Sequence, residues 1–107
     1  MNQGDVYWFT FRAPDKRRPV LILTRDSAIN YLTSITVAPI TSTIRGTPSE
    51  IILTSADGLF NECAVNFYNI QSIPKSSLGS FIAHLSPARM RDARAAIEFA
   101  LGLDTLT

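Results

Sequence analysis

The chain has 107 residues, of which 46% are hydrophobic and 18% are charged, and its formal net charge at pH 7 is +1. This size and composition predict one small globular domain over residues 1–107, with too few residues for two independent cores. The near-neutral charge excludes a bulk polycation, so any binding of nucleic acid must come from local clusters of basic side chains.

Cysteine usage and the N-terminal sequence indicate the compartment. Cys63 is the single cysteine and lies within an apolar run, so it cannot form a disulfide within the chain or a cysteine metal cluster. A small core residue is the expected role for it rather than a nucleophile. Residues 1–5 are polar and lack the apolar core of a signal peptide, and no apolar stretch approaches membrane-spanning length. We expect a soluble, cytoplasmic protein.

The first predicted strand covers residues 6–11, which are dense in strand-forming side chains on both faces. A strand that is apolar on both faces needs cover on both, from a closed barrel, a helix or a partner subunit. Residues 12–17 contain Pro14 and several charged side chains and are expected to form a loop. Residues 20–25 then predict a second strand, buried over its apolar part.

Arg18 stands at the mouth of this second strand, directly before Pro19. A residue before proline is pushed into extended geometry, which stiffens the backbone that carries the guanidinium. The guanidinium itself is permanently charged and has five donors. These properties suit a side chain aimed at a fixed anion, and a solvated basic loop leading into a core strand is the alternative.

The middle of the chain predicts short elements. Residues 26–32 indicate a turn with a loose helical piece, and residues 34–40 a strand. Pro39 suits the end of that strand because it cannot donate to the ladder. Residues 41–49 are rich in hydroxyl groups and contain a glycine and a proline, which is typical of a loop. A short strand at 50–53 and a connection at 54–61 follow.

A longer strand is predicted over residues 62–73. Strict alternation would place Ala64, Asn66, Tyr68 and Ile70 on one face. Asparagine and glutamine are unusual inside strands, and this segment has three such amides, so we expect a bulge, a solvent-facing groove or a recognition surface. Amides both donate and accept hydrogen bonds, which suits the reading of base edges.

The chain closes with a turn at 74–79, a strand at 80–85 and a helix. Ser86 is the expected N-cap and Pro87 the first helical residue. Gly102 is the expected C-cap. The predicted buried stripe of the helix consists of Met90, Ala93, Ile97 and Leu101.

About six short strands and one terminal helix predict a mainly β (α+β) fold. In a chain of this length we expect a small, strongly curved antiparallel barrel with the helix over one opening or face.

The inventory of reactive side chains limits the chemistry. One histidine, one cysteine and scattered carboxylates show no spacing typical of metal ligands, and isolated glycines form no phosphate loop, so we expect no metal and no cofactor. His84 lies inside a predicted strand and is expected to be a satisfied structural histidine. Arginine, hydroxyl and amide groups remain. They suit phosphate chemistry in which the substrate supplies the nucleophile, such as the 2′-hydroxyl of RNA.

Five segments follow one another along the chain: Gly4-Asp5-Val6-Tyr7-Trp8, Arg18-Pro19-Val20-Leu21-Ile22-Leu23, Val37-Ala38-Pro39-Ile40-Thr41, Cys63-Ala64-Val65-Asn66-Phe67-Tyr68-Asn69-Ile70 and Leu85-Ser86-Pro87-Ala88-Arg89-Met90. In their order and spacing, these segments resemble the MazF/PemK family of toxin–antitoxin ribonucleases. The resemblance implies an SH3-like, plasmid-maintenance-toxin barrel that acts as a homodimer. It also implies a metal-independent, sequence-specific endoribonuclease that cuts single-stranded RNA, leaves 2′,3′-cyclic phosphate and 5′-hydroxyl ends, and is blocked by a cognate antitoxin.

In this resemblance the family's arginine before Pro-Val falls on Arg18, and its threonine after the third strand falls on Thr41. Arg18 would hold the scissile phosphate and neutralise the charge that develops on it. Thr41 would donate a hydrogen bond to the phosphate or orient the 2′-hydroxyl, and a loop-capping hydroxyl is its alternative role. The residues expected to bind RNA around them are Lys16, Arg17, Thr43, Arg45, Asn66, Tyr68 and Asn69.

The chain departs from the family where some members carry an arginine and an aspartate. Asn66 and Tyr68 stand there instead, so an acid–base scheme built on those residues is not available. We therefore expect Asn66 and Asn69 to help read bases. Tyr68 is expected either to stack on a base or to pack in the core or dimer interface.

Two other functions stay open at this point. One is a CcdB-like inhibitor of DNA gyrase on the same fold, which depends on a C-terminal tryptophan motif, whereas the single tryptophan here is Trp8. The other is a bare RNA-binding module, in which losing Arg18 would change the salt slope by roughly 0.7 with no cleavage to lose. The late basic cluster of Arg89, Arg91 and Arg94 is expected to be a solvated helix face, with an RNA contact as the alternative.

Overall fold

The computed structural model describes residues 1–11 and 16–106, and leaves out the side chain of Lys16. Its strands are β1 Asp5–Phe11, β2 Lys16–Ile22, β3 Ser34–Thr41, β4 Glu50–Leu53, β5 Cys63–Asn66, β6 Gln71–Pro74 and β7 Leu78–His84. Its α-helices are the single turn α1 Asp26–Ile29 and the longer α2 Pro87–Ala100. Short 3₁₀ turns are η1 Ser55–Asp57, η2 Phe67–Asn69, η3 Lys75–Ser77 and η4 Leu103–Thr105.

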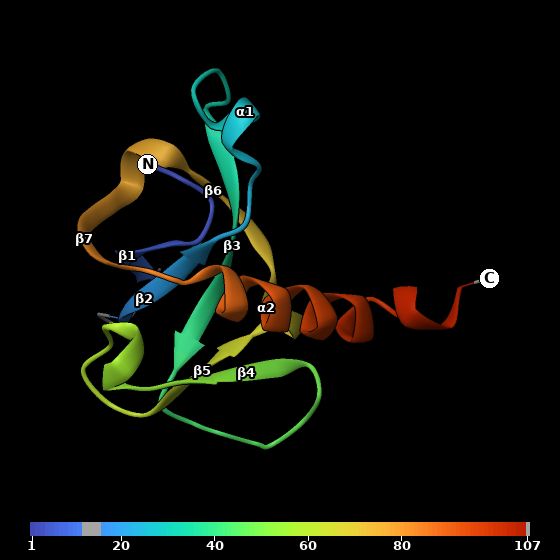
Figure 1. The fold of residues 1–107 in the computed structure, drawn as a ribbon. Helices are drawn as coiled ribbons and strands as arrows, with labels where there is room; N and C mark the ends of the chain where they lie inside the picture. Colours follow the sequence, from blue (N-terminus) through green and yellow to red (C-terminus); the bar gives the residue numbers. More distant parts are fainter. Residues whose placement is uncertain (12–15, 107) are drawn as a thin grey trace.

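All strand pairs are antiparallel, in the order β4-β5-β3-β2-β1-β7, and β3 is the strand at which the sheet divides (Figure 1). The first half of β3 pairs with β6, whereas Ile40 and Thr41 at its end pair with β5. β2 occupies the other edge of β3. The expected mainly β fold of antiparallel strands with a C-terminal helix is confirmed, with seven strands rather than about six.

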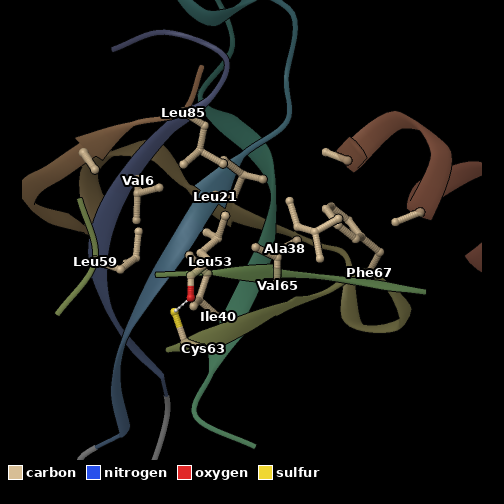
Figure 2. Close-up of a cluster of buried hydrophobic side chains, with 14 residues drawn as sticks. Val6, Leu21, Ala38, Ile40, Leu53, Leu59, Cys63, Val65, Phe67 and Leu85 are labelled. Carbon is tan, nitrogen blue, oxygen red and sulfur yellow. Dashed lines mark hydrogen bonds between the residues drawn. The ribbon is translucent and has the colours of Figure 1, made fainter. Parts of the chain in front are cut away.

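Two hydrophobic clusters cover the two faces of the central strands. Between the sheet and α2 lies the cluster in Figure 2, in which Leu21, Ala38 and Phe67 are almost fully buried. Neighbouring residues on the same strands point the other way, because side chains alternate along a strand. They form a second cluster that includes Val20, Ile22 and Val37. Each cluster therefore takes alternate residues of β2 and β3.

β1 receives cover on both faces, as its composition predicts. Val6 is buried in the cluster under α2, while Tyr7, Phe9 and Phe11 pack against the second cluster. The ring of Tyr7 also meets that of Phe81 edge-on, with 5.6 Å between ring centroids. This strand thus joins the two halves of the core.

β2 begins and ends earlier than predicted, and the loop expected over residues 12–17 gives way to strand at Lys16. Residues 12–15 lie outside the described residues. Lys16 pairs with Phe11, and Pro19 pairs with Trp8. This long ladder with β1 outweighs the low intrinsic strand propensity of the basic segment. Pro19 lies one residue before the β2–β3 ladder begins at Val20, and its missing donor is tolerated at such a boundary.

The single strand predicted over residues 62–73 is wrong, because the chain turns after Asn66. The Asn66 side-chain oxygen accepts a hydrogen bond from the Tyr68 backbone N–H at 2.9 Å, which stabilises the turn η2. Such local bonds compete with a strand ladder. Phe67, 1% exposed, then anchors the turn in the core. The interruption that the amides suggested is real, but strict alternation stops at Asn66.

The start of α2 agrees with the prediction. The hydroxyl of Ser86 accepts from the backbone N–H of Arg89 at 3.2 Å, and Pro87 is the first helical residue. The buried stripe is shorter than predicted, because Leu101 follows the last helical residue and is 59% exposed. Ala96 is buried in its place. Among the described residues, no helix is long and apolar enough to span a membrane.

Arg89 ties α2 to the turn η1 and is not part of a solvated face. Its Nε donates to Asp57 Oδ1 at 2.9 Å, and its Nη2 donates to Asp57 Oδ2 at 3.3 Å. Asp57 Oδ2 also accepts from the backbone N–H of Thr54, which caps the same turn. The hydrogen bonds from Arg89 hold the pKa of Asp57 below its ordinary value. Arg91 and Arg94 are exposed, as predicted.

Replacing Arg89 by glutamine should lower the free energy of unfolding by about 1 kcal/mol at neutral pH, a value discounted for the partly exposed guanidinium. The pKa of Asp57 is lower in the folded state, so its contribution is present above about pH 4 and is lost as pH falls through the folded-state pKa. Urea unfolding of both proteins at about pH 7 and about pH 2 measures this.

Arg94→Gln is the matched control, because Arg94 is 81% exposed and reaches Glu98 only at 3.7 Å. It should change stability by less than about 0.5 kcal/mol. An Arg89 effect that is equally large at both pH values would contradict the ion-pair explanation.

Candidate functional site

The register of β2 and β3 brings Arg18 and Thr41 together. Val20 pairs with Pro39 at the end of the β2–β3 ladder, so Arg18 and Thr41 each lie two residues beyond that pair on neighbouring strands. Side chains two residues apart along a strand point to the same face, so both lie on the face of Val20 and Pro39. Both residues line two of the same surface pockets, so the pairing expected from sequence is a feature of the structure.

The Thr41 hydroxyl already has one partner. Its oxygen accepts the backbone N–H of Thr43 at 3.2 Å, which holds the start of the loop that follows β3. A hydroxyl that accepts one hydrogen bond still has its own hydrogen to donate. The Thr41 hydroxyl can therefore cap the loop and donate a hydrogen bond to a ligand at the same time.

Arg18 is half-buried. Within the described part of the chain, no carboxylate lies within 4.0 Å of it. Its position is central, because it lines three separate pockets. A guanidinium with no described carboxylate partner is suited to bind an anion such as a phosphate.

On one side of Arg18 lies a polar hollow, here called the amide pocket, of about 270 Å³. The amides of Asn66 and Asn69 belong to it because the turn η2 directs them there. Its full lining is Arg18, Pro39, Thr41, Thr43, Arg45, Glu50, Asn66 and Asn69. Four residues predicted to bind RNA therefore meet here beside Arg18 and Thr41.

Hydrogen bonds fix the walls of the amide pocket. Glu50 Oε1 accepts the backbone N–H groups of Arg45 at 2.8 Å and of Gly46 at 2.7 Å, which shapes the loop between β3 and β4. The side-chain oxygen of Asn66 is used by Tyr68, as described above, so its NH₂ group is the part left for a ligand. The pocket therefore presents the donors of Arg18 and Asn66 together with the carboxylate of Glu50, whose Oε1 is already occupied by two backbone N–H groups.

Tyr68 lies in a neighbouring hollow that also includes Arg18, together with Phe11 and Gln71. Its side chain is 61% exposed, so it is not a core residue. An exposed phenol ring beside a guanidinium is available for stacking.

The third hollow, here called the aromatic pocket, was only partly foreseen. Arg17 was predicted as a binding residue, and its guanidinium carbon lies 4.2 Å from the centre of the Trp8 ring. Phe60 stacks on Trp8, with 5.6 Å between centroids and 18° between planes. The lining is Trp8, Arg17, Arg18, Pro19, Ile40, Thr41, Ser42, Leu59, Phe60, Asn61, Glu62 and Cys63. The sequence feature that could have indicated this pocket was Phe60, an aromatic residue in the connection predicted over residues 54–61.

Other residues considered from sequence lie elsewhere or play structural roles. His84 Nδ1 lies 2.7 Å from Oδ1 of the buried Asp5, so the histidine is paired as expected, although its ring is exposed.

Cys63 is buried, and burial raises the pKa of its thiol, as do the charges of Asp57 and Glu62. The core role expected for this thiol agrees with its burial. The side chain of Lys16 lies outside the described residues.

Among the described residues, no three histidine, cysteine, aspartate or glutamate side chains are grouped as metal ligands would be. The side chains that line the amide pocket with Arg18 and Thr41 are mainly guanidinium, hydroxyl and amide groups, and Glu50 is the acidic member of this lining. This set can bind a phosphodiester and stabilise negative charge on it.

Comparison with known proteins agrees with this geometry. A family model described as "PemK-like, MazF-like toxin of type II toxin-antitoxin system" matches residues 2–101. The chain belongs to this toxin family. Among curated relatives, the Endoribonuclease MazF3 of Mycobacterium tuberculosis is 42% identical over 90 residues, which cover 84% of this toxin and 87% of the relative.

Solved structures resemble the toxin over nearly its whole length. The Mycobacterium tuberculosis toxin MazF-mt6 superposes with a TM-score of 0.84 at 37% identity, covering 92% of this chain and 96% of that one. An endoribonuclease in complex with its cognate antitoxin, from a mycobacterial species, gives a TM-score of 0.87 at 26% identity, covering 96% of each. The seven-stranded fold with its terminal helix is thus the fold of this family.

Proposed function

We propose that this toxin is an endoribonuclease that cleaves single-stranded RNA at the Arg18–Thr41 site without a metal ion. The observation that carries the proposal is the convergence of an unneutralised guanidinium, a hydroxyl with a free hydrogen and the donors of the amide pocket. The relatives at about 40% identity that are named as endoribonucleases support the same activity.

The reaction needs no nucleophile from the protein. The 2′-oxygen of RNA attacks the adjacent phosphorus, the bond from phosphorus to the 5′-oxygen breaks, and a 2′,3′-cyclic phosphate forms. The 2′-hydroxyl proton passes to water, and the leaving 5′-oxygen takes a proton from water. Arg18 stabilises the charge that develops on the phosphate, and Thr41 donates a hydrogen bond to it.

The substrate is held beside this centre by the residues around it. Arg17 and Arg45 supply positive charge to the backbone of the RNA. The amides of Asn66 and Asn69 contact base edges, and Tyr68 stacks on a base. Their positions in hollows that share Arg18 support this assignment.

The test is incubation of the purified toxin with a long single-stranded RNA in EDTA, with the product ends mapped. Discrete cuts at a repeated short sequence, with cyclic phosphate on one side and 5′-hydroxyl on the other, are the expected result. Intact RNA in the presence of folded toxin free of antitoxin would overturn the proposal.

Thr41 gives a sharper prediction within this scheme. Thr41→Val should lower kcat/KM by about 10- to 100-fold, as expected for losing one hydrogen bond to a charged group. Thr41→Ser keeps the hydroxyl and should retain most of the activity. Steady-state cleavage of a short labelled RNA measures both variants. Equal losses in valine and serine variants would show that the hydroxyl is not what matters.

We further propose that the toxin acts as a cytoplasmic homodimer and is blocked by an antitoxin. The relative solved with its cognate antitoxin supports the partner. An acidic segment with apolar side chains would suit the surface around Arg17, Arg18, Arg45 and Tyr68. A free thiol at Cys63 is in keeping with a reducing compartment.

A further inference from the structure

Phe60 is an apolar side chain held in water beside the candidate active site. It is 65% exposed, although it stacks on Trp8. Trp8 is in turn contacted by the Arg17 guanidinium at 4.2 Å. The three side chains form a continuous group, and the phenyl ring offers much of its surface to a ligand.

The loop that carries Phe60 is built to hold it there. The preceding Leu59 is 5% exposed and packs in the core (Figure 2). Gly58 has a φ of +92°, and a Cβ at this position would lie 2.9 Å from the Cβ of Ala83, so only glycine fits. The ion pair between Asp57 and Arg89 fixes the turn before it. The buried Leu59 and the required glycine at position 58 therefore determine where the Phe60 side chain is presented.

The aromatic pocket beside Phe60 suits a flat, neutral occupant. Its volume is about 400 Å³, within the range of pockets that take small organic ligands. Apolar side chains such as Ile40 and Leu59 line it, and the carboxylate of Glu62 disfavours a second anion. Arg18 and Thr41 line the same hollow, so an occupant would adjoin the group that they bind.

We propose that Phe60 and Trp8 form a stacking platform for a nucleobase next to the scissile phosphate. The inference rests on the proposed ribonuclease function and assigns residues that sequence analysis left out. Every base has a π-face, so the platform contributes affinity and places the sugar-phosphate chain against Arg18. A second copy of the chain covering Phe60 is the competing occupant.

The test uses a short fluorescein-labelled RNA that spans a mapped cut, with a 2′-deoxy nucleotide at the attacking position to prevent cleavage. Phe60→Leu keeps an apolar side chain but removes the aromatic face, and should weaken binding by about 5- to 100-fold. Phe60→Trp should bind as well as the unchanged toxin or better. Trp8 is the only tryptophan, so a change in its fluorescence on adding the unlabelled RNA reports binding beside the aromatic pocket in the unchanged toxin.

Tyr31→Ala is the control, because Tyr31 is 75% exposed, follows α1 by two residues and lines none of the three pockets that include Arg18. It should leave binding unchanged. If the toxin cuts RNA but Phe60→Leu binds as tightly as before, the platform is wrong and the ribonuclease proposal stands. If Phe60→Leu instead dissociates a dimer, measured by light scattering, with unchanged affinity per subunit, the second copy is the occupant. If the unchanged toxin neither cuts nor binds RNA, both proposals fail.

Discussion

Replacing Arg18 by alanine is expected to lower the rate of RNA cleavage by about 10²- to 10³-fold, the usual cost of losing one preorganised donor at the site of developing charge. The fold should be almost unaffected, because the side chain is half-buried and no described carboxylate pairs with it. Single-turnover cleavage with saturating toxin separates this effect on the chemical step from weaker binding.

Two further variants test whether cleavage needs the guanidinium at position 18 or only positive charge somewhere on the surface. Arg18→Lys keeps the charge but loses the planar fork of donors, so it should recover only part of the activity. Arg91→Ala removes the same charge from an exposed site on α2, outside the described pockets around Arg18, and should cut at nearly the normal rate. An equal loss in the Arg18 and Arg91 variants would mean that general attraction of RNA explains the effect.

Replacing Phe67 by alanine is expected to lower the free energy of unfolding by about 3–5 kcal/mol, because it empties the space of a large side chain that is only 1% exposed. That is a large part of the stability of a domain of this size, and the melting temperature should fall by about 12 °C or more. Calorimetry and urea unfolding measure both quantities. Activity should fall as well, since Phe67 anchors the turn that carries Asn66 and Asn69.

The adjacent Tyr68 is the matched control. It is an aromatic residue of the same turn but 61% exposed, so Tyr68→Ala should change stability by less than about 0.5 kcal/mol. Its expected effect is on RNA affinity. If both alanine variants were equally unstable, the division of this turn into an anchor and a contact residue would be wrong.

The parts of the fold that depend on local chemistry could be predicted from sequence. Ser86 and Pro87 predict the start of α2 because capping and a preset φ act within one turn. Arg18 and Thr41 were placed together through the resemblance, and their strands have the register that this requires. The β4 strand at Glu50–Leu53 also has its predicted bounds.

The errors have a different physical origin. The turn after Asn66 is stabilised by one hydrogen bond that the Asn66 side chain accepts from the Tyr68 backbone, and the alternation of apolar residues carries no sign of this bond. The stack of Phe60 on Trp8 joins two segments far apart in the chain, and so does the ion pair of Arg89 with Asp57. Such contacts follow from the folded topology and not from spacing within either segment.

The most direct test of the account concerns the nucleophile. A short RNA that contains one mapped cut is made in two forms, identical except for a 2′-deoxy nucleotide on the 5′ side of the scissile phosphate. If the 2′-hydroxyl is the nucleophile, the toxin cuts the all-ribose form and binds the deoxy form without cutting it. Cleavage of the deoxy form at the same bond would contradict attack by the 2′-hydroxyl, and with it the role assigned to Arg18 and Thr41.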